Sequence, residues 1–256
     1  MLGLDHLRQC ARPMVFETGI RSAAFSIAGT AFLVGFHRAL FVITARHVVR
    51  DWPVHKLVVY PSDRSRNGLR LSDWWHVEDD ENEPDSSDLF LVCAELTNVP
   101  KSIRKSSHLL HLTPPHVSDW FKDRHSATFF TFGYPKVVNE ADYAKSQIKT
   151  QQFFLRGTYV GPSVSGGCHE LLLRNPLDLP DFNGLSGSPV FCLRNEVAAP
   201  TQPTFCGMAL RGTSSSGRMH FLEASVILLA LQEAVDAQQP HAPDRLQRAS
   251  PAVAGR

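Results

Sequence analysis

The segment DFNGLSGSPVF, residues 181–191, decides how the rest of the chain is interpreted. Its glycines and serines stand between apolar runs, and it ends in Pro-Val-Phe. Clusters of Gly and Ser between apolar segments are typical of turns, so the segment taken alone indicates a loop that enters a strand. The alternative is a tight backbone loop that presents Ser186 as a nucleophile. The rest of the chain must supply what such a nucleophile needs.

Length and composition limit the function classes. The chain has 256 residues, of which 43% are hydrophobic and 20% charged, and its net charge is +1. These values fit a globular chain with one large β domain or two small ones. The small net charge gives no field that would attract nucleic acid or an anionic membrane. No apolar run is long enough to span a bilayer, and the first residues lack the apolar region of a signal peptide. We therefore expect no nucleic-acid or membrane partner and a cytoplasmic location.

The cysteines and histidines indicate neither a disulfide framework nor a metal site. The five cysteines form no CxxC pair, and the twelve histidines show no zinc spacing. HExxH and phosphate-loop motifs are also absent, so we expect no metal and no cofactor. Cys192 and Cys206 either face each other across a hairpin or are two small buried hydrophobes, and the second interpretation is favoured.

The dominant pattern is short apolar runs separated by Gly, Pro, Asn, Asp and Ser. Their β-branched and aromatic content predicts strands. The predicted strands form two sets of six: residues 23–28, 30–36, 39–44, 56–61, 73–77 and 88–96, then 127–134, 153–161, 169–174, 188–194, 204–212 and 218–224. We therefore expect an all-β fold of two six-stranded antiparallel β-barrels. Apolar residues along one stripe of residues 223–237 predict a C-terminal helix after them.

This pattern divides the chain into four parts. Residues 1–20 form an N-terminal extension, 21–113 the first barrel, 114–237 the second barrel with the C-terminal helix, and 238–256 a tail. The tail is rich in Pro, Ala, Gln and Arg, which predicts disorder.

A serine nucleophile requires a base, an acid that orients the base, and N–H donors for the oxyanion. His47 is the candidate base, because the apolar run FVIT leads directly into ARHVV. Alone, a histidine beside apolar residues more often has a structural role. Asp88 is the candidate acid, because it opens the apolar run LFLV. Asp85 is the alternative acid, but its Pro-Asp-Ser surroundings are typical of an exposed turn.

Taken together, these segments resemble the trypsin-like serine proteases with the chymotrypsin fold. TARHV resembles the family's Thr-Ala-Ala-His motif, SDLFLV its Asp-Ile-Ala-Leu strand, and GLSGSPV its Gly-Asp-Ser-Gly-Gly-Pro motif. The separations also suit the family, because His47 and Asp88 are 88 − 47 = 41 residues apart and Asp88 and Ser186 are 186 − 88 = 98 residues apart. The chain is similar to bacterial, intracellular members, and the resemblance covers residues 20–237.

The resemblance implies a serine endopeptidase. In that interpretation Ser186 attacks the peptide carbonyl, His47 transfers the proton, and Asp88 orients the imidazole. The backbone N–H groups of Gly184 and Ser186 form the oxyanion hole. A glycine suits position 184, where a Cβ could obstruct the turn of the backbone toward substrate.

The resemblance also implies a substrate site. Leu210, Arg211 and Gly212 match the strand that pairs with an extended substrate, although an ordinary hairpin strand is the alternative. If Asp181 points into the specificity pocket, Arg or Lys is preferred at the P1 position of the substrate. Leu185 stands where secreted members have the Asp that pairs with a new N-terminus after cleavage. We therefore expect no activation by N-terminal processing.

A second hypothesis assumes the same protease fold but no catalytic turnover by the isolated chain. In it the chain is a latent or inactive protease-fold module that needs a regulatory protein partner. Under the first hypothesis the partner is a protein or peptide substrate.

Overall fold

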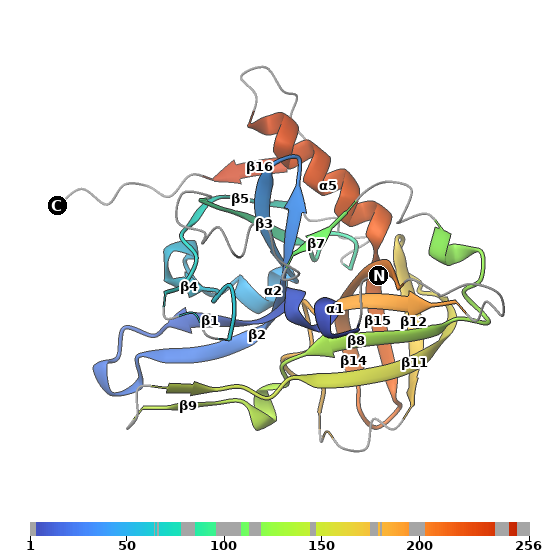
Figure 1. Ribbon diagram of the computed structural model, residues 1–256, viewed down its shortest axis with the longest axis horizontal. Helices are drawn as coiled ribbons and strands as arrows, with labels where there is room; N and C mark the ends of the chain where they lie inside the picture. The colour runs from blue at the N-terminus through green and yellow to red at the C-terminus, as the bar shows by residue number, and fades with distance from the viewer. Residues whose placement is uncertain are drawn as a thin grey trace.

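Two β-sheet units and a long C-terminal helix make up the structure, which is a computed structural model (Figure 1). The structure describes residues 4–63, 65, 67–77, 85–95, 109–112, 119–143, 147–174, 179, 181–194, 203–238 and 246–249. The β-rich architecture predicted from the short apolar runs is confirmed.

The second unit is a closed barrel of six strands. In spatial order the strands are β11 (Phe153–Pro162), β12 (Cys168–Arg174), β15 (Arg218–Glu223), β14 (Thr204–Thr213), β13 (Pro189–Leu193) and β8 (Thr128–Gly133). All neighbouring pairs are antiparallel. Phe129, Val190 and Phe221 fill the interior with 0% exposure, and Trp120 closes it from the short helix η4 (Asp119–Phe121). Six predicted strands therefore form the barrel that was expected.

The first unit is a curled sheet that stays open. In spatial order its strands are β16 (Leu246–Ala249), β5 (Leu71–Val77), β6 (Phe90–Ala94), β3 (Ala39–Thr44), β2 (Phe25–Phe36), β1 (Ala11–Glu17) and β4 (Leu57–Val58), and β7 (Leu110–His111) also pairs with β2. Among the described strands β4 and β5 form no ladder, which differs from the closed first barrel expected. Beyond the two-residue β4, the Leu69 N–H donates to the Val59 carbonyl at 2.8 Å, which links the two margins.

The N-terminal segment belongs to this sheet and is not an extension outside it. Helix α1 (Leu4–Cys10) leads into β1, whose residues pair with β2 from Ala11 opposite Phe32 to Glu17 opposite Phe25. The first six residues of β1 are all buried. Pro13 obscured this strand in the sequence, because proline usually breaks a ladder. Here β4 pairs only with Val15 and Phe16, so the missing N–H of Pro13 removes no bond to β4.

The C-terminal helix is confirmed as α5 (Ala224–Ala237). Ile227, Leu231 and Ala234 on its buried face have 0% exposure and join a core cluster that contains residues of both units. Beyond the helix, residues 246–249 form β16 along β5, opposite Trp74 to Val77. This strand differs from the disordered tail predicted from composition, because backbone pairing at a sheet edge needs little from the side chains.

The remaining elements are short. They are the helices α2 (Arg46–Val49), η1 (Arg21–Ala23), η2 (Val54–Lys56) and η5 (Lys136–Val138), and the hairpin strands β9 (Glu140–Asp142) and β10 (Gln147–Lys149). The β9–β10 hairpin follows β8 and runs beside β2 (Figure 1). Among the described helices, none is long and apolar enough to cross a membrane.

The burial of β1 predicts that shortening a side chain in this strand destabilises the protein far more than shortening one in the neighbouring helix α1. Met14 has 0% exposure, whereas Leu4 in α1 is 45% exposed. Met14→Ala should lower the free energy of unfolding by about 2–5 kcal/mol, because it opens a cavity in the core. Leu4→Ala should change it by less than about 0.5 kcal/mol. Urea unfolding measures both, and equal effects would mean that β1 is not part of the core.

Candidate active site

His47 and Asp88 meet through two hydrogen bonds. His47 lies in the single turn of α2, directly after β3, and Asp88 lies just before β6. Asp88 Oδ1 accepts the backbone N–H of His47 at 2.9 Å, and Oδ2 lies 2.5 Å from His47 Nδ1. The Arg46 N–H also donates to the Asp88 carbonyl at 3.3 Å. The carboxylate therefore fixes the imidazole by Nδ1 and leaves Nε2 for another partner.

Ser186 lies at the tip of a tight loop between β12 and β13. The Leu185 N–H donates to the Phe182 carbonyl, and the Ser188 N–H to the Leu185 carbonyl, both at 3.0 Å. Gly184 and Gly187 have φ angles of +92° and +88°, a conformation that strongly favours glycine. The small residues of this segment therefore serve its backbone geometry.

A glycine of β2 brings Ser186 close to the helix that carries His47. A Cβ on Gly29 would lie 3.0 Å from Val48 Cγ1 and 3.4 Å from the Ser186 carbonyl oxygen. Among the described residues, Ser186 Oγ makes no hydrogen bond to His47 Nε2. Catalytic hydrogen bonds often shorten only when substrate binds. The structure thus pairs His47 with Asp88 and places the Ser186 loop near the helix that carries His47.

The backbone of the loop presents two unused donors. The N–H groups of Gly184 and Ser186 donate no hydrogen bond to the backbone of the described residues. The carbonyl of Asn183 accepts the Lys136 N–H at 2.7 Å. In a planar trans peptide the N–H points opposite to the carbonyl, so the Gly184 N–H is directed away from Lys136. This orientation matches what an oxyanion hole requires.

Thr30 of β2 holds this loop against the first sheet. Its Oγ1 donates to the Gly184 carbonyl at 2.7 Å and accepts the Tyr134 N–H at 2.9 Å. Its own N–H donates to the Ser186 carbonyl at 3.2 Å. A Cβ on Gly187 would lie 2.0 Å from the Thr30 carbonyl oxygen, so only glycine fits there. The sequence placed Thr30 in the predicted strand of residues 30–36 but gave no sign of this role.

Asp85 and Arg211 form an ion pair between the two units. Arg211 Nη2 donates to Asp85 Oδ2 at 2.6 Å. The Asp85 side chain is 9% exposed and that of Arg211 is 59% exposed. Asp85 was expected in an exposed turn, and it does lie in a turn, but it is buried. Its carbonyl also accepts the Asp88 N–H at 3.3 Å, so the ion pair joins the turn that leads to Asp88 to strand β14.

The predicted substrate strand has an open edge. β13 pairs with β14 only as far as Met208, and Ala209 then exchanges hydrogen bonds with Gly187 and Ser188. Beyond Ala209, no described strand pairs with that edge of β14. Arg211 and Gly212 therefore lie on an unpaired stretch of the strand edge, just beyond the residue that bonds to the Ser186 loop. The Leu210 side chain is buried and lies at a bulge.

Asp181 has a local partner. Its Oδ1 accepts the Asn183 N–H at 2.8 Å, which stabilises the turn into the Ser186 loop. The sequence placed Asp181 near the specificity pocket, and this bond gives it a structural role as well.

The cysteines do not suit nucleophilic chemistry. All five are free; four of them are buried and Cys93 is partly exposed. Burial raises the pKa of Cys10 to about 12 and that of Cys206 well above its usual value. Burial also raises the pKa of Cys93. A neutral thiol is a poor nucleophile, so Ser186 is the better candidate. No group of three or more His, Cys, Asp or Glu side chains suited to a metal ion occurs among the described residues.

Comparison with solved structures assigns the architecture. A thermostable serine protease from an extremophilic microorganism aligns with a TM-score of 0.50 and 13% identity, covering 90% of this chain and 98% of that one. The catalytically active tobacco etch virus protease, solved with its product, aligns with a TM-score of 0.51 and 13% identity, covering 98% of this chain and 84% of that one. The fold is chymotrypsin-like. No protein-family model and no curated protein matches the chain.

In this chymotrypsin-like fold, Thr30 should contribute strongly to stability. Thr30→Val would leave the Gly184 carbonyl and the Tyr134 N–H buried without a partner, at about 1–3 kcal/mol for each group. Thr30→Ser keeps the hydroxyl and should cost only about 1 kcal/mol for the lost methyl group. Urea unfolding compares the two variants. Equal losses would show that the hydroxyl does not hold the loop.

Proposed function

We propose that this protein is a serine endopeptidase that uses Ser186, His47 and Asp88. The observation that carries the proposal is the pairing of an oriented histidine with two unused backbone donors, at Gly184 and Ser186, on the loop of a candidate nucleophile. An orienting carboxylate, a base and preorganised donors are the components of acyl transfer by a serine. The protease titles of both structural neighbours add support from the fold.

The reaction follows from these positions. Ser186 Oγ attacks the substrate carbonyl while His47 Nε2 takes its proton, and Asp88 stabilises the imidazolium through Nδ1. The developing oxyanion accepts hydrogen bonds from the N–H groups of Gly184 and Ser186. His47 then returns the proton to the leaving amine, and water hydrolyses the acyl-enzyme by the same steps.

The open edge of β14 suits a protein or peptide substrate. An extended chain placed beside residues 210–212 can add to the barrel as a further strand, with main-chain hydrogen bonds that do not depend on sequence. Because Ala209 is bonded to the Ser186 loop, that strand would pass directly beside the nucleophile.

A latent form of the same enzyme is the second candidate. The observation in its favour is that Ser186 Oγ and His47 Nε2 are not hydrogen-bonded to each other. In this interpretation a regulatory partner completes the triad.

Labelling with a fluorophosphonate probe tests the nucleophile. We expect one adduct on the wild-type chain and none on Ser186→Ala, because only an activated serine reacts with such a probe. Peptide hydrolysis by the variant should fall by about 10⁶-fold. Intact mass spectrometry measures the adduct, and circular dichroism confirms that the variant folds. An adduct that persists on Ser186→Ala would place the nucleophile elsewhere.

Asp181→Asn separates the two roles of Asp181. Asparagine keeps an Oδ1 acceptor for the Asn183 N–H, so the turn should survive, but the negative charge is lost. If Asp181 also faces the specificity pocket, the wild-type protein prefers Arg and Lys over Leu at P1, and the variant loses this preference. The measurement is kcat/KM on a P1-varied peptide series. A wild-type preference for small or apolar P1 residues would remove Asp181 from the pocket.

A further inference from the structure

A cavity of about 710 Å³ lies apart from the triad. Its lining comes from three parts of the chain: residues of β1, η1 and the start of β2; Tyr60, Ser62, Asp63 and Ser65 after β4; and Ala141, Asp142, Tyr143, Ile148 and Thr150 of the β9–β10 hairpin and its end. The volume lies in the range of sites that hold small molecules or short peptide segments. His47, Asp88, Ser186 and the Gly184 loop contribute none of the lining.

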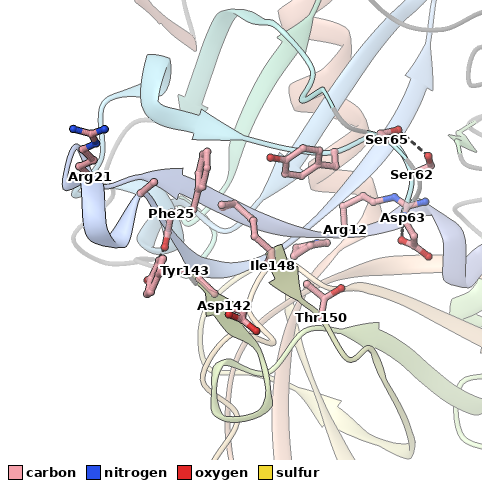
Figure 2. A pocket seen from close by; sticks show the side chains of 15 residues that line it. Arg12, Arg21, Phe25, Ser62, Asp63, Ser65, Asp142, Tyr143, Ile148 and Thr150 are labelled. Carbon is pink, nitrogen blue, oxygen red and sulfur yellow. Dashed lines mark hydrogen bonds and ion pairs between the residues drawn. The ribbon is translucent and has the colours of Figure 1, made fainter. Parts of the chain in front are cut away.

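The walls of this cavity are apolar and its margin is charged. Phe25 from β2 and Ile148 from the hairpin supply apolar side chains, and Val15 lies in the wall with 0% exposure. Figure 2 shows Arg21 at one end and Arg12 with Asp63 at the other. The Arg12 guanidinium donates to Asp63 at 2.6 Å, so its charge is balanced.

Arg21 supplies the positive charge that is available to a bound molecule. It is exposed and makes no ion pair within the described part of the chain, whereas the cavity's Asp142 lies 3.2 Å from Lys149 Nζ. The complementary occupant therefore combines an apolar group with one negative charge.

The hairpin also has main-chain N–H and C=O groups with which a bound peptide could form hydrogen bonds. Among the described strands β10 pairs only with β9, so one edge of the hairpin is open. Hydroxyl groups of Tyr60, Ser62, Ser65 and Thr150 line the same cavity. An open strand edge, hydroxyl groups and one cation favour an extended peptide over a compact small molecule.

The hairpin wall is connected to the candidate oxyanion hole. At the base of the hairpin, Asn139 Oδ1 accepts the Gln151 N–H at 2.6 Å, and Asn139 Nδ2 donates to the Pro135 carbonyl at 2.5 Å. The next residue, Lys136, donates its N–H to the Asn183 carbonyl. That bond orients the peptide that carries the Gly184 N–H.

The opposite wall reaches the same loop through β2. Tyr143 Oη of the hairpin region donates to the Phe25 carbonyl at 2.8 Å, which closes one side of the cavity. Along the same strand, Thr30 bonds to the carbonyls of Gly184 and Ser186. Both walls of the cavity are therefore connected, one through Thr30 and the other through Lys136, to the segment that presents the two donors.

We propose that this cavity binds an acidic, apolar peptide segment of a partner protein and that its occupation stabilises the Gly184 and Ser186 donors. The peptide's carboxylate pairs with Arg21 and its apolar side chain lies between Phe25 and Ile148. By ordering the hairpin, it favours the Lys136–Asn183 bond and raises the reactivity of Ser186. The regulatory part of this inference rests on the proposed function, whereas the binding part does not.

Binding is tested first, with the acetylated and amidated pentapeptide SEFVS carrying a fluorophore and with its uncharged counterpart SQFVS. We expect saturable binding of SEFVS to the full chain by fluorescence polarisation. Arg21→Gln should weaken it by about tenfold, to the level of SQFVS, because a charge-assisted contact is lost. Ala141→Phe should abolish it by filling the cavity. Arg174→Gln, an exposed charge on the second barrel, is the matched control and should bind as the wild type does. Equal binding by all variants, or none by the wild type, would overturn the site.

Coupling is tested by the rate of fluorophosphonate labelling. SEFVS at saturation should raise the labelling rate of the wild type by roughly fivefold or more. Asn139→Ala should still bind the peptide but lose this response, because the hairpin is then disconnected from Pro135 and Gln151. Peptide binding without any change in labelling rate would overturn the regulatory inference alone. Folded protein that binds SEFVS but is never labelled would overturn the proposed function and leave the binding site standing.

Discussion

Thr30 forms the contact on which the arrangement of the candidate site depends. It lies in the middle of β2 with 0% exposure, and its backbone and hydroxyl together hold the carbonyls of Gly184 and Ser186. The Thr44 hydroxyl donates a hydrogen bond to the Thr30 carbonyl at 2.7 Å. Inside a protein each buried polar group needs a partner, so a shift of the Ser186 loop would leave several groups unsatisfied at once. This requirement fixes the loop of the second unit on a strand of the first.

The two halves of the candidate triad depend on different kinds of support. His47 and Asp88 are held within the first unit, where one carboxylate bonds to both the backbone and the ring of the histidine. Ser186 depends on contacts between the units, through Thr30 and the close approach of Gly187 to it. The Asp85–Arg211 ion pair adds a second link, but with Arg211 half-exposed such a pair contributes only about 0–1 kcal/mol. The relative position of the units is therefore set mainly by the buried hydrogen bonds and by apolar packing.

Local pattern was sufficient to predict much of this fold, and the failures have a common cause. The six strands of the second barrel and strand β3 follow from the β-branched and aromatic content of their apolar runs, and helix α5 follows from its apolar stripe. β1 was missed because its burial depends on pairing with β2 and because Pro13 weakened the strand pattern. β9 and β10 are three residues each, too short for any periodicity. The open margin of the first sheet depends on the length of β4, which composition does not specify.

The candidate site shows the same division. Motif spacing singled out His47, Asp88 and Ser186, because the chemistry of a serine nucleophile restricts which residue types can assist it. Thr30, Asn139 and the Asp85–Arg211 pair could not be found in that way. Their roles come from partners far away in the chain; Gly184, for example, lies 154 positions after Thr30. A threonine in a strand or an asparagine after a short helix carries no local signal of such a partner.

The candidate oxyanion hole depends on the orientation of one peptide group, the one between Asn183 and Gly184. The Gly184 N–H points away from Lys136 because the carbonyl on the other side of the same peptide bonds to Lys136. A single hydrogen bond of this type contributes about 0.5–1.5 kcal/mol net, which corresponds to roughly a tenfold bias at most. A population ratio of that size is moved by a modest difference in binding energy between the two orientations. Lys136 begins η5, which is followed by Asn139 and then by the β9–β10 hairpin. Under the proposed regulation, a peptide bound to the hairpin would act on this ratio without touching Ser186, His47 or the substrate.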